Sequence, residues 1–264
     1  MRANRLKSVM TDGGTAVNAW LSIGSGYAAE GVAHQGFDSV TVDLQHGMIG
    51  FGTALTMFQA ISTTDAVPLA RVPDNDPAQI MRLLDAGAYG IICPMISTPD
   101  QAWAFARACR YPPRGNRSFG PSRGLLHGGP DYFANANDEM LVMPMIETRE
   151  AVECIDAIVA IDEVDMVYIG PNDMALAYGE QPGAATDGPR TAQAIAHVLE
   201  RTHAAGKMAG IFCPDGAGAR TRAEEGFDLV TPGNDFGNLT RTLRAAVGLI
   251  RGDGAAAGGN SGGY

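Results

Sequence analysis

The chain lacks the features that mark membrane proteins and nucleic-acid-binding proteins. It has no apolar run long enough to span a bilayer, and the charged N-terminal stretch 1–14 is not followed by one. We therefore expect neither a signal peptide nor a membrane partner. Positive charge is scarce, because 19 Lys and Arg residues face 29 Asp and Glu residues, for a net charge of −10. This balance argues against a nucleic-acid partner, which would call for a basic face.

Cysteine is also scarce, and its spacing excludes the usual structural uses. The four cysteines, Cys93, Cys109, Cys154 and Cys213, lie far apart and form no C-x-x-C pair. We interpret them as reduced core residues of a cytoplasmic protein. The composition, with 45% apolar and 18% charged residues, is that of a globular chain able to bury a full core.

Short apolar, β-branched runs alternate with helix-period segments from start to finish. This pattern is typical of a parallel sheet with crossover helices, for instance a helix predicted over 76–88. Eight runs favour a closed (β/α)₈ barrel, a fold that needs about 250 residues. The runs are 17–24, 38–46, 67–73, 90–96, 141–147, 166–173, 208–214 and 228–235.

Two segments break this rhythm. Residues 111–140 are too long and too rich in Gly, Pro and Asn for a simple connector, so we expect a functional or interface loop. Residues 252–264 have no apolar period and are predicted to form a flexible Gly/Ala-rich tail. The barrel is therefore assigned to residues 1–251 as a single domain.

Polar residues end several of the apolar runs, which is where a barrel of this kind carries its active site. A purely structural barrel has no need to bring carboxylates, an imidazole and a guanidinium to one rim. These residues are Asp43, Gln45 and His46 after the second run, Arg71 after the third, Glu147 after the fifth, Asn172 and Asp173 after the sixth, and Asn234 and Asp235 after the eighth.

Glu147 and Asp173 follow neighbouring runs and carry hard oxygen ligands. Together they could share one Mg²⁺, Mn²⁺ or Co²⁺ ion and leave coordination positions open for water and substrate. The alternative is that each acid, or Asn172, caps the helix that follows it. Spacing alone does not separate the two interpretations.

Arg71 and His46 suggest chemistry on an anion. Arg71 ends a run that is otherwise apolar, so it needs a partner, either an anionic ligand or a rim acid such as Asp43. His46 is a candidate general base, with Asp43 orienting it. The turn Gly170-Pro171-Asn172-Asp173 offers backbone N–H groups at a helix start for a carboxylate, although it is also ordinary turn chemistry.

Lysine is almost absent, and this excludes one mechanism. The only two are Lys7, in the N-terminal arm, and Lys207, just before the seventh run. A Schiff-base mechanism needs a lysine inside the barrel or at its catalytic rim. The scarcity favours a metal ion as the electron sink.

A dinucleotide-binding motif is a minor alternative. Gly24-Ser-Gly26-Tyr-Ala-Ala29 follows a run, precedes a helical segment and is followed by Asp43 at the end of the next run. It matches the fingerprint of NAD-dependent dehydrogenases. This interpretation leaves the acids after the fifth and sixth runs unexplained.

The chain resembles the HpcH/HpaI family of class II 2-oxo acid aldolases, which share the phosphoenolpyruvate/pyruvate barrel. The similarity extends from about residue 17 to about residue 250. Seven motifs in order carry it: GFDSVTVDLQHG (36–47), ARVP (70–73), LLDAGAYGIICPMI (83–96), RYPPRGNRSFG (110–120), MIETREAV (145–152), YIGPNDMALAYG (168–179) and AAGKMAGIF (204–212).

The resemblance implies a role for each rim residue. Glu147 and Asp173 would bind the divalent ion, and Arg71 would polarise the ketone oxygen. His46 with Asp43 would move a proton through water. The backbone after Gly170, over Gly170, Pro171, Asn172 and Asp173, would hold the substrate carboxylate.

The resemblance also implies the reaction and the assembly. We expect cleavage or formation of 4-hydroxy-2-oxo acids from a pyruvate or hydroxypyruvate enolate and an aldehyde. We expect a homo-oligomer, a hexamer built as a trimer of dimers, in which a C-terminal helix over 236–251 packs on a neighbour.

Three departures from the family pattern concern the far end of the substrate. Gln45 replaces a common glutamate, Met145 replaces a common glutamine, and the loop 117–123 reads RSFGPSR. They leave open another carbon–carbon lyase or a decarboxylase acting on a metal-bound 2-oxo acid.

Overall fold

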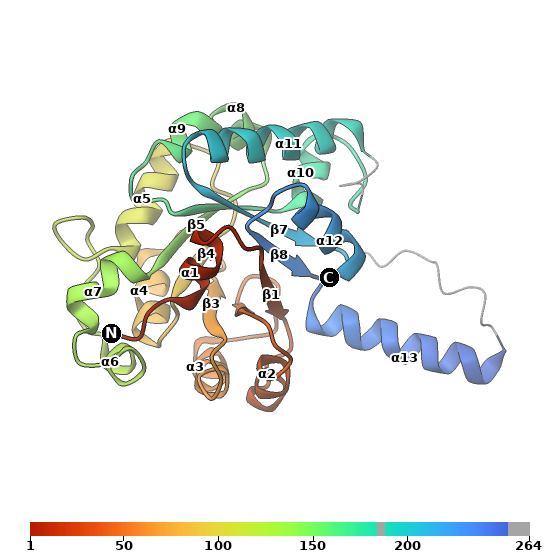
Figure 1. Cartoon of the computed structure of the whole chain (residues 1–264), viewed down its shortest axis with the longest axis horizontal. Coiled ribbons are helices and arrows are strands. Elements are labelled where there is room, and N and C mark those ends of the chain that lie inside the picture. Colours follow the sequence, from red (N-terminus) through yellow and green to blue (C-terminus); the bar gives the residue numbers. More distant parts are fainter. Residues whose placement is uncertain (184–187, 253–264) are drawn as a thin grey trace.

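Eight parallel strands close into a barrel in sequence order, with β8 paired to β1, in the computed structural model, which describes residues 1–183 and 188–252 (Figure 1). This confirms the (β/α)₈ fold expected from the eight runs. The strands are β1 Ala16–Leu21, β2 Ser39–Asp43, β3 Val67–Arg71, β4 Gly90–Cys93, β5 Leu141–Ile146, β6 Met166–Ile169, β7 Met208–Cys213 and β8 Leu229–Pro232.

Helices cover the outside of the barrel and connect successive strands. The predicted helix over 76–88 is α4, where the Asp76 side chain accepts a hydrogen bond from Ala78 N–H and Pro77 occupies the first turn. The helices are α1 Arg5–Thr11, α2 Gly26–Ala33, α3 Phe51–Ile61, α4 Pro77–Asp85, α5 Pro99–Cys109, α6 Ser122–Gly128, α7 Tyr132–Glu139, α8 Arg149–Glu153, α9 Ile155–Val159, α10 Pro171–Ala177, α11 Pro189–Ala204, α12 Gly216–Glu224 and α13 Asp235–Arg251.

The strands are shorter than the runs that predicted them. β2 ends at Asp43 and β6 ends at Ile169, although the runs continue to 46 and 173. The residues after each strand belong to the loops of the rim. The polar residues singled out from the sequence therefore lie at strand ends or just beyond them.

Alternate side chains of the strands form a partly polar barrel interior. The buried Asn18 Oδ1 of β1 accepts hydrogen bonds from the hydroxyls of Ser39 and Thr41 on β2, at 2.9 and 3.0 Å. Its Nδ2 donates to Thr231 Oγ1 of β8, also buried, at 2.9 Å. Because side chains alternate along a strand, Asp43 faces the same interior as Ser39 and Thr41.

The segment 111–140, which we expected to be a functional or interface loop, is partly helical. It contains α6 and α7, and buried arginines fix it to the barrel. Arg110 donates to the carbonyl oxygens of Asn137 and Met140, both at 2.7 Å. Tertiary contacts thus stabilise two short helices whose residues have low helix propensity. Its role as an interface or functional segment stays a prediction.

The predicted C-terminal helix is present as α13. It projects away from the barrel, and none of its residues is buried (Figure 1). Leu239, Leu243, Val247 and Ile250 are exposed along it. Of the predicted tail, only Gly252, which ends α13, is described; 253–264 lie outside the described residues. No described helix has both the length and the apolar character needed to cross a bilayer.

Candidate active site

Arg71 and Asp43 form a buried, bidentate ion pair at the carboxyl ends of β3 and β2. The two residues are Cα partners in the strand register, so their side chains emerge on the same side of the sheet. Arg71 Nε lies 2.8 Å from Asp43 Oδ1, and Nη2 lies 2.6 Å from Oδ2. The rim acid proposed as the partner of Arg71 is therefore Asp43.

Asp43 also fixes the loop that carries His46. Its Oδ1 accepts the backbone N–H groups of Gln45 and His46 at 3.0 and 3.3 Å, and its Oδ2 accepts the indole N–H of Trp20 at 3.2 Å. Burial alone would raise the pKa of Asp43, but the hydrogen bonds and charge of Arg71, with these further donors, lower it below the ordinary value. Asp43 is thus held ionised, and the exposed His46 is oriented through its backbone.

Glu147 is the first residue after β5, and its carboxylate is almost completely buried. Oε1 accepts the backbone N–H of Met95 at 2.8 Å. Oε2 lies against Gly170, where a Cβ would approach it to 2.2 Å. Burial raises the pKa of Glu147 to about 7; the charge of Asp173 adds to the rise, while Met95 N–H and Arg71 oppose it. Glu147, Asp173 and Arg71 are therefore electrostatic neighbours.

Neither Glu147 nor Asp173 is a helix cap, so the capping interpretation is wrong. Thr148 caps α8 through a hydrogen bond from Ala151 N–H, and Gly170 occupies the cap position of α10. Asp173 lies in the first turn of α10 and is exposed. Neither acid therefore has the helix-capping role that was the alternative to metal binding.

The two acids fit a divalent metal ion. Their oxygens are hard donors, and the charge of Asp173 opposes ionisation of Glu147, a repulsion that a cation would remove. In residues 1–183 and 188–252 no group of three or more His, Cys, Asp and Glu side chains forms a metal cluster. Metal binding by this pair of carboxylates stays a prediction.

The start of α10 supplies backbone N–H groups at the same rim. Pro171 occupies the first helical position, and the N–H groups of a first turn have no partner within the helix. The side chain of Asn172 does not cap α10, and its Oδ1 accepts Gly183 N–H at 2.9 Å. Binding of a carboxylate by this backbone stays a prediction.

Asn234 and Asp235 have structural roles. The Asn234 side chain caps α13 by accepting Gly237 N–H. Asp235 accepts the N–H groups of Ser22 and Ile23 at 2.8 and 3.1 Å, and thereby joins the end of β8 to the end of β1. Asn234 thus begins α13, and Asp235 supports the junction of β8 and β1.

Both lysines lie at the opposite end of the barrel. Lys7 Nζ donates to the carbonyl oxygen of Asp138, before β5, and Lys207 Nζ donates to that of Asp162, before β6. The structure thus agrees with the exclusion of a Schiff base. The acid of the dinucleotide motif is not available to a nucleotide, because Asp43 is fully buried against Arg71 and Trp20.

The sequence did not point to Trp20 or Met95. Trp20 looked like one more apolar residue of the first run, although a buried indole N–H needs an acceptor and therefore signals a polar neighbour. Met95 acts through its backbone in a left-handed conformation, φ 56°, which no side-chain pattern reveals.

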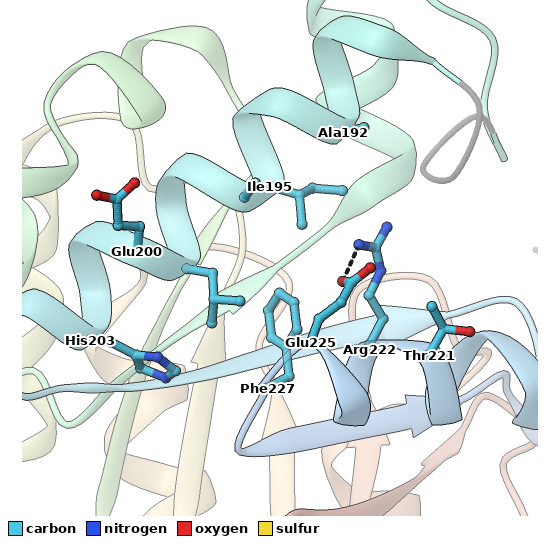
Figure 2. A pocket seen from close by; sticks show the side chains of 10 residues that line it. Ala192, Ile195, Glu200, His203, Thr221, Arg222, Glu225 and Phe227 are labelled. Carbon is cyan, nitrogen blue, oxygen red and sulfur yellow. Dashed lines mark hydrogen bonds and ion pairs between the residues drawn. The ribbon is translucent and has the colours of Figure 1, made fainter.

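A groove of about 630 Å³ lies on the outside of the barrel, between α11 and α12 (Figure 2). Ile195 and Phe227 line it with His203, and Arg222 pairs with Glu225 at 2.6 Å beside it. None of the predicted site residues lines this groove. It is separate from the rim.

The closed barrel and its acidic, arginine-containing rim define the class of α/β-barrel enzymes. The chain belongs to the HpcH/HpaI aldolase/citrate lyase family, whose model matches residues 17–241. It is a carbon–carbon lyase of the class II aldolase type. Enzymes of this family generally depend on a divalent metal ion.

Individual relatives cover almost the whole chain. The chain is 44% identical to a hydroxypyruvate/pyruvate aldolase of Rhizorhabdus wittichii, over 92% of this chain and 97% of the relative. It is 36% identical to a hydroxypyruvate/pyruvate aldolase of Chromohalobacter salexigens, over 91% and 95%. A crystal structure of an HpcH/HpaI aldolase/citrate lyase family protein from Burkholderia cenocepacia superposes with a TM-score of 0.87 at 32% identity, over 94% of this chain and 99% of that one.

Proposed function

We propose that the protein cleaves 4-hydroxy-2-oxo acids into pyruvate or hydroxypyruvate and an aldehyde, and catalyses the reverse addition. The two relatives named hydroxypyruvate/pyruvate aldolase support this substrate class. The observation that carries the proposal is the buried carboxylate of Glu147, whose pKa is raised by the charge of Asp173 and lowered by that of Arg71. With a divalent cation held by the two acids, such a centre would stabilise the negative charge of an enolate.

Glu147 and Asp173 would hold one Mg²⁺, Mn²⁺ or Co²⁺ ion. When bound, the ion would supply a Lewis acid for the C2 carbonyl and for the enolate that forms from it. Met95 N–H and Gly170 fix the Glu147 carboxylate in place. This leaves the remaining coordination positions to water and substrate.

Arg71 and the first turn of α10 would orient the substrate. The guanidinium of Arg71 carries a fixed positive charge beside the site, and it would stabilise negative charge that develops on the C2 oxygen. The backbone N–H groups after Gly170 would bind the carboxylate. Both groups are held before substrate arrives, Arg71 by Asp43 and the turn by its helix.

His46 would handle the proton, through a water molecule, on a loop that Asp43 fixes. The C4 hydroxyl loses its proton to this base, the C4–O electrons form the aldehyde carbonyl, and the C3–C4 bond breaks. The electron pair of that bond becomes the enolate of the 2-oxo acid. A proton then adds to C3, and pyruvate or hydroxypyruvate leaves.

The assembly and the compartment are part of the proposal. The exposed apolar side chains of α13 would pack on a neighbouring copy, in the hexamer expected from the resemblance. The reaction would take place in the cytoplasm, where the free thiols of Cys93, Cys109 and Cys213 stay reduced.

The test is a cleavage assay over a panel of 4-hydroxy-2-oxo acids, with pyruvate and hydroxypyruvate as the measured products. The protein is first freed of metal and then assayed with added Mg²⁺, Mn²⁺ or Co²⁺. We expect activity only after metal is restored, and no covalent adduct after borohydride treatment with pyruvate.

Two results would contradict the proposal. Full activity after thorough metal removal would exclude the roles of Glu147 and Asp173. Release of CO₂ in place of an aldehyde would assign the site to the alternative decarboxylase. A Glu147→Gln variant is the matched comparison in the metal-restoration assay, because it keeps the volume of the side chain and removes its charge.

A further inference from the structure

Trp20 contacts both members of the central ion pair. It lies on β1 within two residues of the strand's end, and it is 1% exposed. Its indole N–H donates to Asp43 Oδ2 at 3.2 Å. The Arg71 guanidinium lies over its ring, with Cζ 4.8 Å from the centroid. One side chain thus binds the carboxylate by its edge and the guanidinium by its face.

The contact to Asp43 constrains the geometry of Arg71. Asp43 Oδ2 accepts both Trp20 Nε1 and Arg71 Nη2, while Oδ1 accepts Arg71 Nε and two backbone N–H groups. Removing the indole N–H would leave Oδ2 with one fewer donor. The carboxylate could then rotate, and the bidentate pair would lose its fixed angle.

The barrel interior holds Trp20 in turn. Its ring packs against Tyr168 at 5.5 Å and against Phe212 edge-on at 5.6 Å, between centroids. The Tyr168 hydroxyl lies 2.6 Å from Thr231 Oγ1, which also accepts Asn18 Nδ2. The indole is therefore supported by a polar network that runs across the barrel beneath the rim.

We propose that Trp20 is a positioning residue of the reaction, which sets the angle of the Arg71 guanidinium through Asp43. The inference rests on the proposed function, because it gives Arg71 the developing charge on the C2 oxygen. Trp20 does not act on the substrate. It reduces the freedom of Arg71, so its loss lowers the rate of the chemical step more than the affinity for the substrate.

The experiment compares Trp20→Phe with wild-type enzyme under saturating metal. Because a hydrogen bond to a charged group is lost, we expect kcat to fall about tenfold or more while KM changes less than about threefold. In an Asp43→Asn background, adding Trp20→Phe should lower kcat by less than about twofold, because the charge of the hydrogen-bond acceptor is already absent.

Tyr89→Phe is the matched control. It removes the hydroxyl of a buried aromatic residue that lies before β4, at the opposite end of the barrel, where that hydroxyl donates to the carbonyl oxygen of Arg2 at 3.0 Å. Urea unfolding should show a loss of stability in both variants, with kcat reduced only by Trp20→Phe. An equal fall in kcat for both would assign Trp20 a purely structural role and overturn the proposal.

A second variant covers the case in which Trp20→Phe does not fold. The chain has only one other tryptophan, Trp103, which is half exposed. In a Trp103→Phe background, benzothienylalanine can replace Trp20 and keep the bicyclic ring while sulfur replaces the N–H. Its kcat should again fall about tenfold; an unchanged kcat would overturn the proposal.

The outcomes separate this inference from the proposed function. If wild-type enzyme cleaves no 4-hydroxy-2-oxo acid, the proposed function is wrong and the role of Trp20 falls with it. If wild-type enzyme is active and the Trp20 variants retain its kcat, only the positioning role is wrong.

Discussion

The backbone N–H of Met95 donates a 2.8 Å hydrogen bond to Glu147 Oε1, across the space between the ends of β4 and β5. Met95 has a left-handed backbone, φ 56°, a conformation that costs energy for a residue with a side chain. On the other side of the carboxylate, Gly170 leaves no space for a Cβ. Two loops thus fix the carboxylate of Glu147, which in the proposed function would hold the metal ion.

Gly170→Ala should displace Glu147. The new Cβ would approach Oε2 to 2.2 Å and Met145 Cε to 3.2 Å, so the carboxylate has to move. Because a shift of about 1 Å in a reacting group can cost about 10²-fold, we expect a fall of that order in kcat/KM. Mn²⁺ affinity, measured by titration calorimetry, should fall by about tenfold or more.

The control for this substitution is Gly216→Ala at the start of α12, where a Cβ would meet nothing within 4 Å. It should leave both affinity and rate unchanged. Wild-type Mn²⁺ affinity in Gly170→Ala would show that the Glu147 carboxylate is not part of the metal site.

The stability of the metal-free protein should fall as pH rises from about 4.5 to about 7. The folded state raises the pKa of Glu147 from 4.5 to about 7, so between these values it holds a proton that the unfolded chain releases. The folded state is then favoured at low pH, and this advantage is lost as pH passes the folded pKa. The full effect is about 3 kcal/mol in the free energy of unfolding.

Urea unfolding between pH 4.5 and 8 measures this effect, and Glu147→Gln, which cannot ionise, is the comparison. The pH-dependent difference between the two should shrink when Mn²⁺ is added, because the ion stabilises the carboxylate. Parallel pH profiles in wild type and Glu147→Gln would contradict the prediction.

Arg71→Lys should reduce the rate without abolishing folding. A lysine ammonium cannot reproduce the two hydrogen bonds to Asp43, at 2.8 and 2.6 Å, nor the contact of a planar guanidinium with the face of the Trp20 ring. We expect kcat to fall by about 10²-fold, the cost of losing one preorganised group that stabilises an oxyanion. Steady-state kinetics on the best substrate of the panel measures it.

Arg220→Lys is the comparison, because Arg220 lies on the surface and pairs with Glu224 of its own helix. Its kinetics should match those of wild type. If Arg71→Lys kept the wild-type rate, positive charge alone would suffice at this position and the bidentate geometry would have no catalytic role.

The sequence was informative wherever a residue's position in a strand decides its direction. Asp43 and Arg71 each end a run, and the barrel brings them into register as partners. Strand ends alone did not separate candidate site residues from structural ones, because Asn234 and Asp235 occupy the same kind of position. Asn234 caps α13, and Asp235 joins the ends of β8 and β1.

What could not be predicted depends on backbone geometry and on contacts between distant segments. The backbone N–H of Met95, which donates to Glu147, belongs to a residue with an unusual φ angle. The helices α6 and α7 form in a segment of weak local preference because arginines such as Arg110 bind their carbonyl oxygens. Local pattern carries no information on such contacts, which depend on the closed barrel.

Leu243→Glu should break the assembly that we propose for α13. A helix of 17 residues with no buried side chain has little reason to stay folded alone, and its exposed leucines indicate a partner surface. A carboxylate in that surface would lose its hydration on association, so sedimentation velocity should detect smaller species than for wild type.

Thr242→Glu places the same charge on the neighbouring, polar position and should keep the wild-type assembly. A wild-type protein that sediments as a monomer, or equal dissociation of both variants, would mean that α13 does not pack on a neighbouring copy through Leu243.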